Sequence, residues 1–272
     1  METPQQVVQK IKSVQVQGAK QIALYSLKYL RKFCKKYGFG HKFEIVADTL
    51  ENARPTAVVL HNCLKILKRE RNIETIDRLI KELEKCTRKI AIIGQKIIKN
   101  NQKILTHCHS GEALSVIKEA AKRGKKIEVY ATVTEPLKQG IKTAKELAKE
   151  KIPVTLGEDI AVGHLMYYAD IVIVGSDAMR KNGFINKVGT WLIAEEAKRH
   201  EKPFYVVGSH FKFDSRKKFV LEERSASEIL PKTIKGVKVR NPAFDLVPWK
   251  YVTAVITDKG IFKPSEIKNM IK

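Results

Sequence analysis

The sequence predicts an α/β fold, with a helical N-terminal domain followed by a Rossmann-like parallel-sheet domain. Two observations predict it. Residues 4 to about 100 carry apolar side chains at helical spacing, whereas from Lys103 onward short apolar runs alternate with helical segments. Such alternation produces right-handed crossovers and a parallel sheet covered on both faces. We therefore expect a helical domain over residues 1–100 and an α/β domain over residues 101–272.

The helical half is punctuated by glycine and proline. One helix is expected to stop near Tyr37-Gly38, and the next begins near Phe43. Pro55 should break that helix, because proline disfavours helical geometry at Arg54 and suits the first turn of the following helix. A long periodic run from Asn72 to Lys99 predicts a helix that connects the two domains.

The second half contains six candidate strands separated by helical patterns. The strands are Ile104–Thr106, Ile127–Ala131, Val154–Leu156, Ile171–Val174, Phe204–Val207 and Tyr251–Ile256. The helices between them are expected at about Glu112–Arg123, Leu137–Lys149, Asp159–Tyr168 and Lys187–His200. Neither G-x-G-x-x-G nor G-x-x-x-x-G-K-[ST] occurs, so dinucleotide and nucleoside triphosphate binding are not supported and no cofactor is expected.

Composition places the protein in a reducing compartment. Its four cysteines are Cys34, Cys63, Cys86 and Cys108, and no two form a C-x-x-C pair, which argues against disulfides and a zinc site. The N-terminus has no hydrophobic signal region, and no apolar run reaches the length of a membrane span. We expect a cytoplasmic protein with free thiols, no metal and no membrane contact.

The formal net charge of +23 has two readings. It could serve a polyanionic partner, or it could reflect the Lys/Glu-rich composition of proteins from hot environments. The lysines are spread over every predicted helix without an arginine-rich segment or an aromatic-basic ladder. Direct nucleic-acid binding is therefore not expected.

Three strand ends are candidates for chemistry: the turn at Cys108, the turn over residues 132–140 that contains Pro136 and Gly140, and the turn at Asp177. Asp177 follows the apolar run Ile171–Val174, and ligands of open α/β sheets bind at the carboxyl ends of strands. Its alternative role is to cap the next turn. Cys108 follows the strand at Thr106, where the dipole of the next helix and flanking histidines would lower its pKa; its alternative is a small buried residue. If the two face one another, they suit proton transfer beside a carbonyl group.

At this point the chain resembles one superfamily over nearly its whole length. The runs that carry the resemblance are Ile104–Cys108, Gln139-Gly140, VGSDAMRKNGFINKVGT at 174–190, Pro203–Val207, Arg54–Ala57, and Asn241-Pro242 through Pro264. The superfamily contains the alpha, beta and delta regulatory subunits of translation initiation factor 2B. It also contains methylthioribose-1-phosphate isomerase and ribose-1,5-bisphosphate isomerase. The spacing NG-x-x-NK-x-GT is its most specific element.

The resemblance implies two different functions. Isomerases of the superfamily use a cysteine and an aspartate at the positions of Cys108 and Asp177. They bind sugar phosphate through one arginine in E-T-R-P-x-x-Q-G and another in R-G-A. This chain has Glu135 at the first arginine position and Gln17 at the second. A carboxylate beside a phosphate repels it and removes a bidentate donor.

Other segments look most like the alpha regulatory subunit, namely Ala161–His164, Phe204–Phe213 and the C-terminal run from Asn241. We therefore expect first an archaeal-type regulatory subunit that binds initiation factor 2, through its alpha subunit, and influences its GDP/GTP exchange. The alternative is an aldose-ketose isomerase of the ribose 1,5-bisphosphate or methylthioribose 1-phosphate type that uses Cys108 and Asp177. Whether the protein is an enzyme stays open.

A residual anion site is also expected in the cleft between Cys108 and Asp177. Asn186-Lys187 is predicted to open a helix, whose free N–H groups would favour the phosphate of a sugar or nucleotide. Arg54 would either close over the site or form an interdomain salt bridge. The expected ligand-binding residues are Arg54, His107, Gln139, Gly140, Asn186 and Lys187.

The chain is expected to form a homodimer or a higher homo-oligomer through its second domain. Relatives that it resembles dimerise there, and Trp249 beside Tyr251 suits the centre of an interface. The alternative is an ordinary core tryptophan.

Overall fold

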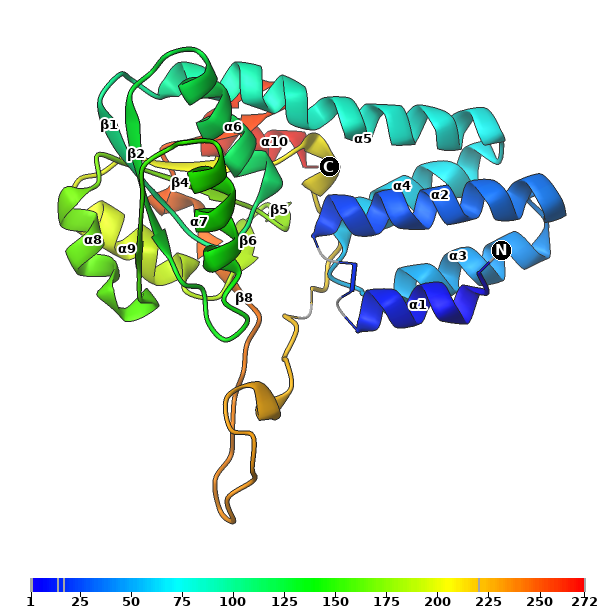
Figure 1. Ribbon diagram of the computed structural model, residues 1–272. Coiled ribbons are helices and arrows are strands. Elements are labelled where there is room, and N and C mark those ends of the chain that lie inside the picture. The colour runs from blue at the N-terminus through cyan, green and yellow to red at the C-terminus, as the bar shows by residue number, and fades with distance from the viewer. Residues whose placement is uncertain (1, 14, 17, 220, 272) are drawn as a thin grey trace. The chain divides into compact units, whose positions relative to one another are not determined.

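The computed structural model describes residues 2–13, 15–16, 18–219 and 221–271, and it confirms the predicted fold class. The chain divides into two compact units, residues 1–86 and 87–272, and the division falls inside a long helix. The sequence-based boundary, after residue 100, assigned that whole helix to the first domain. Each unit has its own architecture (Figure 1).

The first unit is helical. It comprises α1 (Pro4–Lys12), α2 (Ala19–Tyr37), α3 (His41–Ala53), α4 (Val58–Glu70) and the first part of α5 (Ile73–Gly94), which the 3-10 helix η1 (Gln95–Ile97) follows. Pro55 lies before α4, not in its first turn as predicted. The reason is a β-turn closed by a 2.9 Å hydrogen bond from Ala57 N to Arg54 O, in which proline takes its preferred second position.

The second unit is built on a seven-stranded sheet with the order β10-β9-β7-β4-β1-β2-β3. Its members are β1 (Gln102–Thr106), β2 (Ile127–Thr132), β3 (Val154–Gly157), β4 (Ile171–Gly175), β7 (Phe204–Val207), β9 (Ala254–Thr257) and β10 (Gly260–Phe262). All neighbouring strands are parallel except β10, which pairs antiparallel with β9. The carboxyl ends of β4 and β1 therefore lie side by side.

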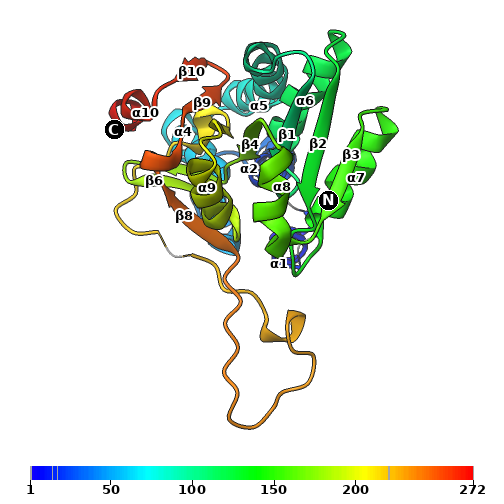
Figure 2. The same ribbon diagram turned by 90° about the vertical axis from the view of Figure 1, so that its left-hand side faces the viewer.

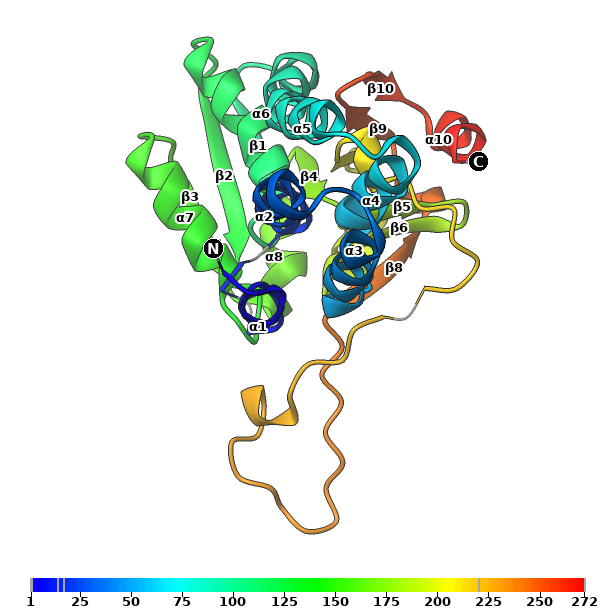
Figure 3. The same cartoon turned by 90° about the vertical axis from the view of Figure 1, so that its right-hand side faces the viewer.

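Helices cover both faces of this sheet (Figures 2 and 3). They are α6 (Gly111–Lys122), α7 (Gln139–Lys149), α8 (Val162–Tyr168), α9 (Thr190–Arg199) and α10 (Pro264–Met270). Alternate residues of a strand enter different cores: Ile104 packs with side chains of α6 and α7, whereas Leu105 packs with those of α8 and α9. The continuous apolar strands found in the sequence are thus buried on both faces.

A three-stranded antiparallel sheet was not predicted. It consists of β5 (Ala178–Arg180), β6 (Gly183–Lys187) and β8 (Phe244–Pro248). The prediction that Asn186-Lys187 opens a helix is wrong, because both residues pair with β8 at the end of β6 and α9 begins only at Thr190. The apolar spacing around Asn182-Gly183 reflects a hairpin whose turn separates β5 from β6.

Other boundaries differ by short segments. Asp159 opens a 3-10 helix, η2 (Asp159–Ala161), before α8. Tyr251 belongs to η5 (Trp249–Tyr251), and β9 begins three residues later. Between η3 (His210–Lys212) and β8 the chain makes an extended excursion that carries η4 (Ala226–Glu228) (Figure 1). None of the helices in the described residues is both long and apolar enough to cross a membrane.

Candidate active site

The loop between β1 and α6 holds Cys108 in a left-handed backbone conformation. Its φ is +66°, and its N–H donates to Thr134 Oγ1 at 2.9 Å. Burial raises the pKa of the Cys108 thiol to about 11, and the nearby positive charge of Lys187 offsets this effect only in part. The sequence-based expectation of a lowered thiol pKa is therefore wrong. The physical reason is that burial by the surrounding fold outweighs the nearby positive charge.

His107 is held on both sides. Its Nε2 lies 2.8 Å from the carbonyl oxygen of Val188, which can only accept, so Nε2 carries the proton. Its Nδ1 then accepts from the Thr132 hydroxyl at 2.5 Å. Burial lowers the pKa of His107 to about 4, so the ring is neutral at pH 7 and does not add a positive charge beside Cys108. The ring orients the loop, and its ligand-binding role stays a prediction.

Asp177 lies at the carboxyl end of β4, the strand beside β1. It is half-buried, and its N–H donates to Ile185 O at 2.7 Å. The negative charge of Asp177 contributes to the raised pKa of Cys108, which places the carboxylate within electrostatic range of the thiol. The structure thus brings together the two residues that the sequence singled out as a thiol-carboxylate pair.

Lys187 supplies a positive charge at this edge of the sheet. Its side chain is buried, and its ammonium group lies 5.0 Å from the centre of the Phe244 ring. The charge of Lys187 lowers the pKa values of Cys108 and His107, so it acts on the same loop. Asn186 is buried beside it and donates through Nδ2 to Thr190 Oγ1 at 3.0 Å. Both residues lie at the end of β6 and not at a helix N-terminus, and the ligand-binding role of each stays a prediction.

Gln139 and Gly140 open α7 beside the end of β2. The Gln139 side-chain oxygen is buried and has no hydrogen-bond partner among the described residues. Gly140 N donates to Val133 O at 2.9 Å, and a Cβ at Gly140 would lie 1.7 Å from Thr132 O. Glycine is therefore required for close packing of α7 against β2, whereas Gln139 presents an unused acceptor.

Three further residues build the site, and none of them was named individually as a site residue from the sequence. Thr132 and Thr134 support the Cys108 loop from the end of β2. Asp159 accepts from the N–H groups of Thr134 and Glu135, at 2.8 and 2.7 Å. Thr132 and Thr134 belong to the strand end over residues 132–140 that the sequence singled out, and the position of Asp159 after β3, at the same edge as Cys108, is the signal that would have identified it.

Three further positions bear on the predicted phosphate binding: Arg54, and the two positions at which this chain departs from the isomerase pattern. Arg54 belongs to the helical unit, at the end of α3, and its role stays a prediction. Glu135 is exposed, and its carboxylate lies 3.4 Å from Lys138 Nζ. Gln17, at the second departure from the isomerase pattern, lies outside the described residues.

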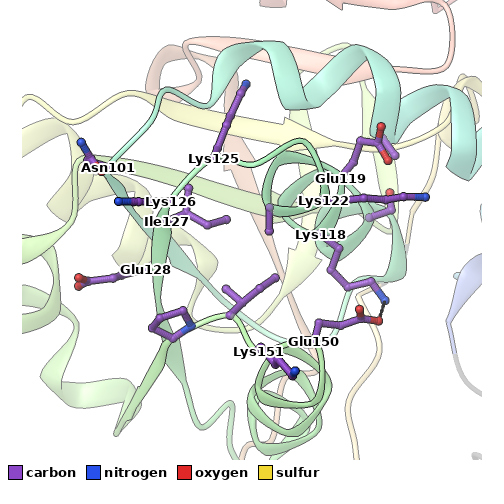
Figure 4. A pocket seen from close by; sticks show the side chains of 15 residues that line it. Asn101, Lys118, Glu119, Lys122, Lys125, Lys126, Ile127, Glu128, Glu150 and Lys151 are labelled. Atoms are coloured by element: carbon purple, nitrogen blue, oxygen red, sulfur yellow. Dashed lines mark ion pairs between the residues drawn. The ribbon is translucent and has the colours of Figure 1, made fainter.

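A cavity of about 1150 Å³ lies at the opposite, amino-terminal edge of the sheet (Figure 4). Its charged lining consists of Lys118, Lys122, Lys125, Lys126, Lys151, Glu119, Glu128 and Glu150. Lys118 pairs with Glu150 at 3.5 Å, and Lys125 donates to the carbonyls of Gln95 and Ile98, each at 2.6 Å. Because α6 and α7 end here, the lysines complement the negative ends of two helix dipoles.

Comparison with known proteins distinguishes the two expected functions. The chain is 40% identical over 284 residues to the ribose 1,5-bisphosphate isomerase of Archaeoglobus fulgidus, covering 97% of this chain and 91% of that protein. It is 38% identical over 308 residues to the methylthioribose-1-phosphate isomerase of Acetivibrio thermocellus, covering 98% and 90%. A crystal structure described as translation initiation factor eIF-2B of Pyrococcus horikoshii OT3 superposes with a TM-score of 0.87 at 27% identity, covering 98% of both chains.

These relatives overturn our first functional expectation. We expected chiefly a regulatory subunit acting on initiation factor 2, but relatives that are 34–40% identical over nearly the full length are named as sugar-phosphate isomerases. The alternative that used Cys108 and Asp177 is the better supported reading. A family model described as the initiation factor 2 subunit family matches residues 15–264. The chain therefore belongs to the initiation factor 2 subunit family.

Proposed function

We propose that this protein is an aldose-ketose isomerase whose substrate is a ribose phosphorylated at its anomeric carbon. The observation that carries the proposal is the placement of Cys108 and Asp177 at the carboxyl ends of the neighbouring strands β1 and β4. The isomerase names of the relatives supply the substrate class. We take ribose 1,5-bisphosphate as the first substrate to test.

The reaction needs one group that gives a proton and one that takes a proton. A hydrogen moves from C2 to C1, the bond between C1 and the ring oxygen breaks, and that oxygen gains the proton that the C2 hydroxyl loses. The raised pKa of about 11 keeps the Cys108 thiol protonated at pH 7, so it can give a proton to the ring oxygen. The Asp177 carboxylate can accept the proton from the C2 hydroxyl. No external oxidant is required.

The surroundings of the pair suit an anionic sugar. Buried Lys187 provides a positive charge for a phosphate, and the unused Gln139 oxygen can accept from a sugar hydroxyl. His107 is neutral, and its two ring nitrogens are bonded to Thr132 and Val188, so the ring holds the Cys108 loop in place and is not available to bind the phosphate. This division of roles assigns chemistry to Cys108 and Asp177 and phosphate binding to Lys187.

Turnover of a sugar panel tests the proposal. The purified protein is incubated with ribose 1,5-bisphosphate or methylthioribose 1-phosphate, and the ketose product is followed by carbon and phosphorus NMR. We expect conversion of one of them, and a loss of roughly 10²–10⁴-fold in kcat for both Cys108→Ser and Asp177→Asn. Cys34→Ala, in the helical unit, and Asp170→Asn, before β4, serve as matched controls. Absence of turnover on both sugars would refute the proposal.

Self-association remains a prediction, as does binding of initiation factor 2. Trp249 does not support the interface expected from the sequence, because it is a core residue: it is buried, donates to Arg180 O at 2.8 Å and packs 5.9 Å from the Phe184 ring centre. Light scattering at micromolar concentration measures the mass directly. A monomer would contradict the expected homo-oligomer.

A further inference from the structure

A fully buried ion pair lies behind the candidate active site and takes no part in the proposed chemistry. Glu112, in the first turn of α6, pairs with Lys212 at the end of η3, and their side chains are only 5% and 7% exposed. The second carboxylate oxygen of Glu112 accepts from Ser209 N at 3.3 Å. The two residues are 100 positions apart in the sequence, and each lies shortly after the end of a strand.

The strand order shows that the Glu112–Lys212 pair reaches across the end of β4. In the sheet, β4 lies between β7 and β1. Glu112 follows β1 and Lys212 follows β7, so the ion pair bridges the two strands that flank β4. The carboxyl end of β4 is where Ser176 and Asp177 leave the sheet. The pair therefore joins the loop that carries Cys108 to the far side of the strand that carries Asp177.

The space around two glycines shows that the Glu112–Lys212 pair packs against the carboxyl end of β4. A Cβ at Gly208 would lie 2.6 Å from Ser176 Oγ and 3.1 Å from Lys212 Cδ, so the lysine stem and the serine share one small space. A Cβ at Gly175 would lie 2.3 Å from Ser110 Oγ, so the loop before α6 packs directly on β4. Ser176 Oγ is buried and has no hydrogen-bond partner among the described residues. Movement of either loop would thus move the Asp177 turn.

Stability alone does not explain such a pair. Removing two charges from water costs more than their attraction commonly returns, and apolar side chains of similar volume often serve stability equally well or better. A reaction that uses two groups from separate loops, by contrast, depends on their separation, because a displacement of about 1 Å can cost roughly 10²-fold in rate. The Glu112–Lys212 pair lies where it can hold the separation of the two reacting groups constant.

We propose that Glu112 and Lys212 are positioning residues that fix the separation of Cys108 and Asp177 by tying the loops after β1 and β7 together across the end of β4. The proposal rests on the proposed isomerase function for its effect on turnover. Its effect on the surroundings of Cys108 can be measured without any substrate.

The test is the double variant Glu112→Leu with Lys212→Met, which replaces the pair by apolar side chains. Both opposite charges are removed, so the net charge near the site is unchanged and a shift reports geometry. We expect a thermal midpoint equal to or above that of the wild type, kcat lowered about 10- to 100-fold and KM changed by less than about threefold. The pH profile of Cys108 alkylation by iodoacetamide, followed on its peptide by mass spectrometry, should move from about 11 toward the ordinary thiol range.

Glu119→Gln with Arg123→Gln is the matched control, because it removes an ion pair, 2.7 Å long, from the far end of the same helix. It should leave kcat and the alkylation profile unchanged. If the apolar double variant does not fold, Glu112→Gln with Lys212→Gln, which also removes both charges but keeps polar side chains, should shift both readouts in the same direction to a smaller extent.

An apolar double variant with the wild-type kcat and alkylation profile would overturn the proposal. If the wild type turns over neither sugar, the isomerase function fails separately, and the alkylation profile alone decides: a shift supports the positioning role, and an unchanged profile refutes it.

Discussion

The two edges of the large sheet use charged and polar side chains in opposite ways. At the carboxyl edge they are buried and have partners from distant loops: His107 lies between Thr132 and Val188, and Lys187 acts on Cys108 from another strand. At the amino edge, lysines line a cavity of about 1150 Å³ close to the ends of α6 and α7. Our proposal places the chemistry at the carboxyl edge because buried polar groups from several strand ends converge there, and not at the edge that has the cavity.

The largest expected difference between the edges is in turnover. A triple variant with Lys122→Gln, Lys126→Gln and Lys151→Gln removes three charges from the amino-edge cavity. Its kcat should stay within about twofold of the wild type, while Cys108→Ser at the carboxyl edge loses roughly 10²–10⁴-fold. The same NMR assay measures both. A triple variant as impaired as Cys108→Ser would move the active site to the lysine-lined cavity.

Backbone substitutions should cost more at the carboxyl edge than at the amino edge. At the carboxyl edge, Gly140→Ala would place a Cβ 1.7 Å from the backbone oxygen of Thr132, and rearranging α7 should cost about 3 kcal/mol or more, the upper end for overpacking. At the amino edge, Gly124 has a φ of +84° and a Cβ added there would meet no atom within 4 Å, so Gly124→Ala should cost only about 1–2 kcal/mol of backbone strain. Urea unfolding of the two variants gives the comparison. Equal midpoints would contradict it.

The third expected difference is a pH dependence of stability that belongs to the carboxyl edge. Because the folded pKa of His107 is about 4 and its ordinary value is about 6.5, the unfolded chain binds a proton first as the pH falls. Stability attributable to His107 is thus present above pH 6.5 and is lost progressively toward pH 4. Hydrogen bonds from His61 and His210 lower the pKa values of the Glu51 and Asp258 carboxyls to about 2. The stability that these two carboxylates contribute is therefore lost only as the pH falls below their ordinary pKa values of 4.5 and 3.8.

Urea unfolding of His107→Gln, compared with the wild type at several pH values, checks this assignment. The variant should show a flatter dependence between pH 6.5 and 4. An amino-edge control, Lys126→Gln, should keep the wild-type slope, and a wild-type slope in His107→Gln would assign the loss of stability to other groups.

Much of the fold could be predicted because its signals are local. The apolar run Phe204–Val207 coincides with β7, and Ile171–Val174 falls one residue short of β4. The positions of Cys108 and Asp177 at strand ends followed from the runs Ile104–Thr106 and Ile171–Val174. Asn186-Lys187 was misassigned because its strand pairs with β8, more than fifty residues later, and no local pattern reports that pairing.

The pKa values and ion pairs of the site could not be predicted because they also depend on residues that are distant in the sequence. The raised pKa of Cys108 comes from burial by the whole fold, and the loop histidine that was expected to lower it is neutral. The Glu112–Lys212 pair joins residues 100 positions apart, so neither residue has a neighbour in the sequence that suggests a partner.

The most direct test of the account is binding of ribose 1,5-bisphosphate measured by calorimetry on Cys108→Ser, which leaves the sugar unconverted. We predict binding close to that of the wild type, and adding Lys187→Ala should weaken it by roughly 1–3 kcal/mol, or about 5- to 150-fold in Kd. Adding the three amino-edge glutamines to Cys108→Ser should change Kd by less than about twofold. No binding at millimolar concentration, or a loss caused by the amino-edge substitutions and not by Lys187→Ala, would contradict a sugar-phosphate site at the carboxyl edge of the sheet.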